Sequence, residues 1–436
     1  MGYINPKKTV TEIFYAALKS ADPYESVKLY SDKIRSVYKE GDFSRLILAG
    51  FGKASCPMAK ALGDSLPDIL HSGIIVTKYG HVKDPPEKIQ VFEAGHPVPD
   101  ENGLKATESI IKLLKSADMN TLSVCLVSGG GSALLVSPHE GITLDEKQKT
   151  THFLLKAGAD IHELNTVRKH ISRVKGGRLA EIAFPSKIIS LILSDVIGDK
   201  LDVIASGPTS PDTTTYDEAI NVIGKYRLTG KIPHAVMDIL VRGREGITPD
   251  TPKQGNRVFE KVENIIIGSN SKALEAAKKK ADSSGLQTEI LSNELTGEAG
   301  DVGRWLAKNA KALKKERRGD KTVNCVISGG ETTVTVKGNG LGGRNTELAL
   351  TFAMEIEGVQ GITLLSAGTD GTDGPTDAAG AIVDGQTIVK ARNAGLDPSK
   401  YLEDNDSYSF FKKTEDLLIT GPTGTNVMDL QILVIE

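Results

Sequence analysis

Runs of consecutive apolar residues alternate with segments of helical periodicity along the first half of the chain. Five runs predict buried strands, at residues 46–49, 73–77, 89–93, 122–128 and 188–194. Their hydrophobicity is continuous rather than alternating, which is typical of strands covered on both faces of a parallel sheet. Apolar residues at helical spacing predict a first helix that stops at Asp22-Pro23, and further helices over 100–117 and 163–183. This alternation predicts an α/β fold with a Rossmann-like, doubly wound parallel sheet.

The pattern changes after Val241, where the chain becomes polar and rich in Gly and Pro through RGREGITPDTPKQGN. Such a composition favours a linker, so we expect one domain over 1–245 and a second over 246–436. The second half predicts a helix capped by Asn270 and two more helices at 305–318 and 347–356. It also predicts strands at 265–267, 288–291, 325–328, 333–336, 362–365 and near the C-terminal Glu436. We expect a smaller α/β domain with a mixed sheet.

Composition narrows the class of protein. A chain of 436 residues with 39% hydrophobic residues and a net charge of -3 is long enough for two domains and too apolar to be disordered. No run approaches the roughly 18 apolar residues of a membrane span, and the near balance of charges gives no field for nucleic acid. The Cys and His residues show neither CxxC nor HExxH spacing, so a zinc site is not indicated. We expect a cytoplasmic protein with small-molecule substrates, whose metal, if any, is held by oxygen.

The first segment that could carry a binding or catalytic function is LILAGFGKAS, residues 46–55, in which Gly52 and Lys53 follow a predicted strand. Glycines there let backbone amides approach an anion at a helix N-terminus. The segment is not a Walker A loop, and it is an incomplete dinucleotide fingerprint because Ser55 replaces the third glycine and the next strand ends at Thr77-Lys78 instead of an acid. Lys53 therefore points to anion binding, with a tight structural turn as the alternative.

The second segment is LVSGGGSALL, which places Ser128, Gly129, Gly130, Gly131 and Ser132 directly after a strand. Three glycine amides between two hydroxyls form a nest suited to a phosphate or a carboxylate. There is no GxSxG elbow, so a nucleophilic serine is not indicated. A purely structural turn is the alternative.

The basic segment NTVRKHISRVKGGRLA, residues 165–180, predicts a helix entered at Asn165 and broken at Gly176-Gly177. On that helix Arg168, Ser172 and Lys175 would share one face. Anion binding and a solvated basic face are equally good interpretations.

Acidic residues at predicted strand ends complete the set. Asp195 ends the most apolar strand, where it could serve as a general base, a magnesium ligand or merely a helix cap. Glu331 lies in SGGE, Arg344 follows the glycine pair of GLGGRNTE, and Asp370 lies in SAGTDGTDGPTDAAG, where Asp373 and Asp377 also alternate with glycines. The aspartate spacing does not fit an EF-hand. Together these residue types are those of phosphoryl transfer, which depends on positioning and charge neutralisation.

These motifs also carry a resemblance. The segments AGFGKAS, GHPVPDENG, SGGGSALL, LSDVIGD, ASGPTSPD, SGGETTVTV, GGRNTELAL, AGTDGTDGPTDAAGA and TGPTGTNVMDL, with the basic segment above, resemble the class II glycerate kinases that carry a C-terminal MOFRL domain, over nearly the whole chain. The resemblance implies an active site in a cleft between a Rossmann-like domain and a smaller α/β domain. It also implies ATP-dependent phosphorylation of D-glycerate to 2-phosphoglycerate with Mg²⁺, in sugar or glycerate catabolism.

The resemblance assigns cleft positions to Lys53, Asp195, Glu331, Arg344, Asp370 and Asn426. We expect Lys53, Asp195 and Arg344 to be catalytic, Glu331 and Asp370 to hold the metal, and Asn426, Arg168, Gly52 and the SGGGS loop to bind substrate or nucleotide. Whether that loop binds the glycerate carboxylate or the phosphates of ATP stays open, as does a homo-oligomer. The alternatives are a nicotinamide-dependent 2-hydroxy acid oxidoreductase and a sugar-phosphate-binding isomerase or regulatory module.

Overall fold

A computed structural model describes residues 5–82, 84–85, 87–316 and 323–436. The chain forms two compact units, each assembled from segments that are not contiguous in sequence. The parallel-sheet unit comprises residues 23–194 and 199–267, and the mixed-sheet unit comprises residues 5–22, 195–198 and 268–436 of the described chain. None of the described helices is both long and apolar enough to cross a membrane.

The sheet of the parallel-sheet unit has the strand order β3-β2-β1-β4-β5-β6. Its strands are β1 (Arg45–Phe51), β2 (Leu70–Lys78), β3 (Ile89–Ala94), β4 (Thr121–Val127), β5 (Lys187–Leu193) and β6 (Val262–Gly268). All pairings from β3 through β5 are parallel. The order reverses between β1 and β4, which are adjacent, and open α/β sheets bind ligands at such a switch point. The predicted Rossmann-like fold class is confirmed.

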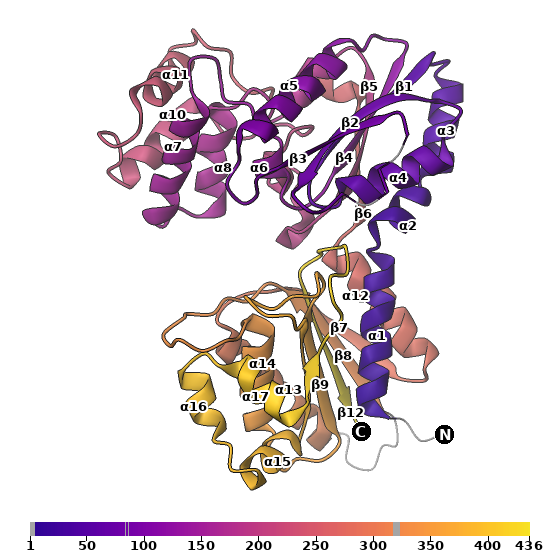
Figure 1. Cartoon of the computed structure of the whole chain (residues 1–436), viewed down its shortest axis with the longest axis vertical. Helices are drawn as coiled ribbons and strands as arrows, with labels where there is room; N and C mark the ends of the chain where they lie inside the picture. The colour runs from indigo at the N-terminus through magenta and orange to yellow at the C-terminus, as the bar shows by residue number, and fades with distance from the viewer. Residues whose placement is uncertain (1–4, 83, 86, 317–322) are drawn as a thin grey trace. The chain divides into compact units, whose positions relative to one another are not determined.

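Two kinds of helices accompany this sheet. The helices next to the strands are α2 (Pro23–Lys28), α3 (Ser31–Glu40), α4 (Ser55–Ser65) and α5 (Glu101–Lys115). Two short helices join them, α6 (Gly131–Leu134) after β4 and α9 (Arg178–Ala183) before β5. A separate helical group is formed by α7 (Leu144–Lys156), α8 (Ile161–His170), α10 (Tyr216–Lys225) and α11 (His234–Arg244) (Figure 1). This group encloses an apolar cluster of its own that includes Leu154, Val167, Ile223 and Leu240. Burial of that cluster stabilises α8, whose last turn carries functional candidates.

The mixed-sheet unit has the strand order β11-β10-β9-β12-β8-β7. Its strands are β7 (Gln287–Leu295), β8 (Asn324–Gly330), β9 (Ile362–Gly368), β10 (Gly380–Asp384), β11 (Leu417–Leu418) and β12 (Asp429–Ile435). β12 lies between β8 and β9 and is antiparallel to both, whereas β7 and β8 are parallel. The start of β12 therefore lies at the same edge of the sheet as the ends of β8 and β9. The predicted mixed sheet is confirmed.

Helices cover both faces of this second sheet. α1 (Pro6–Ser20) and α12 (Asn270–Ser283) lie side by side on one face (Figure 1). The other face packs against α13 (Ala299–Glu316) and α14 (Arg344–Glu355), with α15 (Thr387–Asn393), α16 (Pro398–Glu403) and α17 (Ser407–Thr414) beside them. The N-terminal helix thus belongs with the C-terminal sheet.

The structural division differs from the predicted boundary at 245/246. Residues 246–267 belong to the parallel-sheet unit, because the presumed linker is anchored there by side-chain hydrogen bonds: Asp250 bonds His170, and Thr251 donates to Asp212. Residues 5–22 belong to the mixed-sheet unit. A Gly/Pro-rich composition therefore marked an ordered loop rather than a linker.

Three predicted elements are corrected by the structure. The helix predicted over 163–183 ends at His170, so Arg168, Ser172 and Lys175 do not share a helix face. The strand predicted at 333–336 is absent, and only an isolated bridge joins Glu298 to Thr333. Ser269, not Asn270, caps α12. The predicted helix near 305–318 is found as part of α13, and its last two positions lie outside the described residues.

Candidate functional site

The loops after β1 and β4 interlock at the switch point of the parallel sheet. The Lys53 backbone N–H donates to the Gly129 carbonyl at 2.9 Å, and the Ala54 N–H donates to Ser128 Oγ at 3.1 Å. Ala54 is the residue that precedes α4, so Ser128 supplies the cap that this helix does not find in its own sequence. One loop therefore fixes the backbone of the other.

Two glycines make this close approach possible. Gly52 has a φ of +124°, and a Cβ there would lie 2.5 Å from the Ser128 carbonyl oxygen, so no other residue fits. At Gly130 a Cβ would lie 3.0 Å from the His96 ring and 3.3 Å from Lys53 Cγ. The side chains of Lys53 and His96 therefore lie against the glycine loop.

Positive charge gathers around this loop. The pKa of His96 is lowered to about 4, first by burial and then by the nearby charges of Lys53, Lys78 and His81. His96 is therefore neutral at pH 7, and the lysines supply the charge. Within the described chain, Lys53 has no carboxylate at ion-pair distance. An anion would find an uncompensated cation here.

Arg168 reaches the same loop from the last turn of α8. Its Nη2 donates to the Ser132 carbonyl at 3.2 Å, and its Nε is buried with no hydrogen-bond partner among the residues that the structure describes. The Ser132 hydroxyl contacts Ser206 Oγ at 2.8 Å. The structure thus brings together Lys53, which the sequence analysis expected to be catalytic, with Gly52, the SGGGS loop and Arg168, which it expected to bind substrate or nucleotide.

The mixed-sheet unit holds Arg344 in a rigid acidic frame. Arg344 is the first residue of α14, and its Nε and Nη2 donate to the two carboxylate oxygens of Asp429 at 2.5 and 2.9 Å. Its Nη1 lies 3.2 Å from Glu331 Oε1. Burial alone would lower the pKa of Arg344, but the hydrogen bond and charge of Asp429 raise it above its ordinary value. The guanidinium is permanently charged and fixed in orientation.

The acids come from neighbouring strand ends. Asp429 begins β12 and pairs in register with Gly330 at the end of β8 and Gly368 at the end of β9. Glu331 directly follows β8, and Asp370 lies two residues beyond the end of β9. One edge of the central strands therefore collects three carboxylates.

Asp195 joins this acidic edge. Although it follows β5, its contacts place it in the mixed-sheet unit. The pKa of Glu331 is raised, first by partial burial, then by the charges of Asp429, Asp195 and Asp370, while Arg344 opposes the rise. Negative charge exceeds the single positive charge of Arg344, so this edge suits a cation.

The remaining candidates of this unit differ in their contacts. Asp370 accepts hydrogen bonds from the backbone and hydroxyl of Thr372 within its own turn. Asp373 is buried and caps the start of α14, and Asp377 accepts a bond from Tyr408 Oη, so both have structural partners. Asn426 accepts from the Met428 N–H, which supports the positive φ of +68° at Met428 just before Asp429. Asn426 thus positions the acidic edge.

Comparison with known proteins places the chain in a family. Residues 9–241 match a domain of unknown function, DUF4147, and residues 324–429 match the MOFRL family. The chain is 46% identical to a Thermotoga maritima protein named D-glycerate 2-kinase, over 98% of this chain and 97% of that one. The chain belongs to the class II glycerate kinase family. The resemblance predicted from the sequence is confirmed.

A solved structure agrees with this chain in fold, and further relatives agree with it in sequence. A crystal structure of glycerate kinase from Thermotoga maritima superposes with a TM-score of 0.90 at 46% identity, covering 99% of each chain. A Pyrococcus horikoshii protein named glycerate 2-kinase is 42% identical over 96% of this chain and 95% of its own. An Agrobacterium vitis protein, 41% identical over 99% of this chain and 95% of its own, bears the provisional name of a hydroxypyruvate reductase.

The acidic edge fits the magnesium ion that a kinase of this family implies. Mg²⁺ typically takes one or two protein carboxylates and completes its shell with water and substrate phosphates. Among the described residues, no three His, Cys, Asp or Glu side chains are grouped so as to enclose a metal ion alone. Glu331 is 47% exposed and Asp370 is half-buried, so both can offer oxygens to an ion that arrives with a nucleotide.

Sequence reasoning missed Asp429 as a site candidate, did not single out Lys147, and named Lys175 only as part of a helix face. Asp429 lies in the motif TGPTGTNVMDL, and an acid that opens an apolar strand was the available signal. Lys147 gave no signal, because LDEKQKTTHFLLK has the composition of an ordinary surface helix, yet its ammonium-bearing side chain is buried in the structure.

Proposed function

We propose that this chain transfers the γ-phosphoryl group of ATP to the 2-hydroxyl of D-glycerate, giving 2-phosphoglycerate and ADP. The observation that carries the proposal is Arg344, held by Asp429 and Glu331 at an acidic edge of strand ends. A fixed guanidinium next to carboxylates that suit Mg²⁺ supplies the two elements of charge neutralisation that phosphoryl transfer requires. Family membership supports the same reaction.

The parallel-sheet unit binds anionic groups in this proposal. Lys53 offsets phosphoryl charge, and the loop of Ser128 to Ser132 with Arg168 holds a second anion by backbone N–H groups and a guanidinium. Gly52 lets the Lys53 loop and the Ser128 loop approach each other closely enough to act as one surface.

The mixed-sheet unit handles the transferring group. Asp195 accepts the proton of the attacking hydroxyl, the new O–P bond forms in line, and the bond from the γ-phosphorus to the bridging oxygen of ADP breaks. Arg344 stabilises charge on the equatorial oxygens of the phosphoryl group. Glu331 and Asp370 would hold Mg²⁺, which when bound neutralises phosphate charge.

Four measurements on the intact protein test the proposal. With Mg·ATP and D-glycerate we expect ADP release, and no change in absorbance with NAD(P)H and a 2-keto acid. Enolase added without phosphoglycerate mutase should convert the product, because only the 2-phosphate is its substrate. A ³¹P spectrum with only the 3-phosphate would refute the regiochemistry, and oxidation of NAD(P)H without ADP release would refute the kinase.

The oxidoreductase alternative is the reason for the NAD(P)H assay. The strand order is that of dinucleotide-binding sheets, and one relative is named as a reductase. Such an enzyme typically places an acid after the second strand, whereas β2 here ends at Lys78. The sugar-phosphate-binding alternative predicts neither ADP release nor a change with NAD(P)H.

A further inference from the structure

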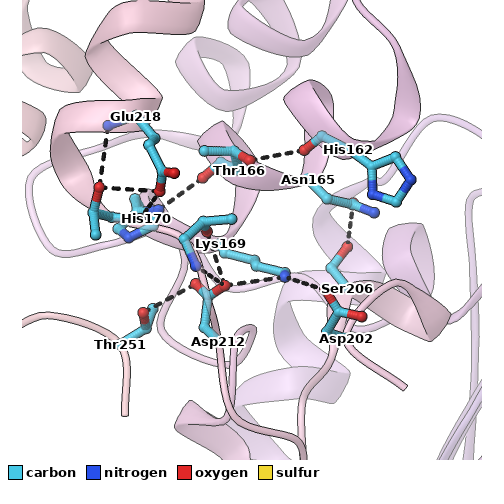
Figure 2. A network of polar contacts seen from close by, with 12 residues as sticks. His162, Asn165, Thr166, Lys169, His170, Asp202, Ser206, Asp212, Glu218 and Thr251 are labelled. Carbon is cyan, nitrogen blue, oxygen red and sulfur yellow. Dashed lines mark hydrogen bonds and ion pairs between the residues drawn. The ribbon is translucent and has the colours of Figure 1, made fainter. Parts of the chain in front are cut away.

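The consecutive residues Arg168 and Lys169 of α8 differ in whether a carboxylate compensates their positive charge. Lys169 is 2% exposed, and its Nζ lies 3.1 Å from Asp212 and 3.5 Å from Asp202 (Figure 2). Asp212 is itself bonded by Thr251, so the buried charge is compensated by a network within the fold. Lys169 is therefore a structural lysine.

Lys147, Arg168 and Lys175 have no such compensation. Lys147 on α7 is 2% exposed, and Lys175, five residues beyond the end of α8, is 0% exposed. Across the described parts of the chain, no carboxylate lies at ion-pair distance from any of the three. Burial, followed by the charge of Arg168, lowers the pKa of Lys147 to about 7, and burial, Arg168 and Lys147 lower that of Lys175 well below its ordinary value. The three cations are thus close enough to repel one another.

The contacts of Arg168 and Lys175 lead to one place, the backbone around Ser132 and Ala205, and Lys147 lies near enough to Arg168 for its charge to act on it. Arg168 donates to the Ser132 carbonyl, Lys175 Nζ lies 3.4 Å from the Ala205 carbonyl, and the hydroxyls of Ser132 and Ser206 are bonded to each other. Ala205 and Ser206 both have positive φ values, of +51° and +63°. Non-glycine residues in that region carry strain, which concentrates at functional sites.

Neutral carbonyls and hydroxyls do not compensate the charges of two buried lysines and the partly buried Arg168. Without a counter-charge a buried lysine is driven toward its neutral form, whereas a ligand of opposite charge would hold it protonated and bind to it. Because both lysines are almost completely buried in the protein, the site favours a small anion over a nucleoside triphosphate with its metal and water. The unpartnered Nε of Arg168 adds an in-plane donor, which suits a planar carboxylate.

We propose that Lys147, Arg168 and Lys175, together with the Gly131–Ser132 segment, form a buried site for the carboxylate of a small organic acid. Resting on the proposed function, this carboxylate is that of D-glycerate, and the site selects the substrate by its charged end. The Ser132 side of the SGGGS loop then binds D-glycerate, the phosphoryl acceptor, rather than the phosphates of ATP.

The test compares Lys147→Met with the matched substitution Lys169→Met. Methionine keeps the length of the side chain and removes the charge. For Lys147→Met we expect a melting temperature equal to or above that of the wild type. The KM for D-glycerate should rise at least about tenfold, because one charge-assisted contact contributes about a factor of ten to binding. The KM for ATP should stay within about threefold of the wild-type value. Lys169→Met should instead lower the melting temperature, because Asp212 loses its partner, and leave the KM for D-glycerate within about threefold.

A binding measurement without turnover separates this inference from the proposed function. D-glycerate at millimolar concentration should raise the melting temperature of the wild type, and equimolar glycerol, which lacks the carboxylate, should not. Lys147→Met should lose this shift and keep the shift caused by Mg·ATP. A rise in the KM for ATP alone, or a melting temperature lowered as in Lys169→Met with glycerate binding intact, would overturn the site. Absence of ADP release by the wild type would overturn the kinase, while the carboxylate site would still be decided by the glycerate and glycerol shifts.

Discussion

The two sheets of this protein present strand ends of opposite charge. At the switch point of the parallel sheet, Lys53 and Arg168 surround a glycine loop, and neither cation has an ion-pair partner in the described chain. At the edge of the mixed sheet, Arg344 is surrounded by carboxylates and makes ion pairs with Asp429 and Glu331. The two regions therefore differ in the sign of their uncompensated charge.

The difference teaches what each arginine does. Arg168 leaves one nitrogen unpartnered, so its unused capacity is available to a ligand. Arg344 spends three nitrogens on protein carboxylates, so its position is determined before any substrate binds. Preorganised charge stabilises a transition state without reorganisation at the moment of reaction. We therefore expect substitutions near Arg168 to affect binding, and substitutions near Arg344 to affect turnover.

The largest effect is expected from Arg344→Lys. A lysine cannot reproduce the paired bonds to Asp429, so kcat should fall at least about 10²-fold, or about 2.7 kcal/mol, with a much smaller change in the KM for ATP. Arg392→Lys, which keeps a surface ion pair with Glu357 in the same unit, is the control and should be near normal. If Arg344→Lys keeps its kcat and raises the KM for D-glycerate, Arg344 binds the substrate carboxylate and the comparison fails.

A smaller loss is expected from Asp429→Asn. Asn retains the shape but offers only one acceptor oxygen, so Arg344 loses a charge-assisted bond and its fixed orientation. We expect kcat to fall about tenfold, roughly 1.4 kcal/mol, with both KM values within a few-fold. Asp377→Asn, at a carboxylate bonded to Tyr408, is the matched control and should retain wild-type kcat. Equal losses in both variants would remove the special role of Asp429.

Much of the fold was predictable because long apolar runs and the Gly-rich loops that follow them are local signals. β1, β4 and β5 are buried along nearly their whole length, as their continuous hydrophobicity indicated. The loops that carry Lys53, Ser128 and Arg344 were found for the same reason.

The failures have a different origin, in contacts between distant segments. Helical periodicity continues past His170, but the backbone of Ile171 and Arg173 bonds to His139 and Ser137 instead, so α8 ends. Lys147 is buried by tertiary packing that no local pattern records. The acidic edge depends on the antiparallel placement of β12, which brings Asp429 beside Glu331 and Asp370 only in the folded sheet.

The smallest expected effect is a pH dependence of stability. The pKa of Lys147 is about 7 in the folded protein against an ordinary value of 10.5, so between these values the unfolded chain binds more protons and stability rises with pH. The neighbouring ionisable groups are Arg168 and Lys175. The lowered pKa of Lys175 also makes stability rise with pH. From pH 7.5 to 8.5 the free energy of unfolding of the wild type should increase by about 1 kcal/mol more than that of Lys147→Met. Denaturant titrations at the two pH values test this, and parallel changes would show that Lys147 is charged and compensated.

The opposite charges of the two strand-end regions are tested most directly by titrating two variants, one from each region, with both D-glycerate and Mg²⁺. We would measure the KM for D-glycerate and the apparent Mg²⁺ constant in Arg168→Met and in Asp370→Asn, the latter of which can keep the bond to Thr372. The account predicts that Arg168→Met raises only the KM for D-glycerate and that Asp370→Asn raises only the Mg²⁺ constant, each by at least about tenfold. A change in the Mg²⁺ constant for Arg168→Met, with an unchanged KM for D-glycerate, would contradict it.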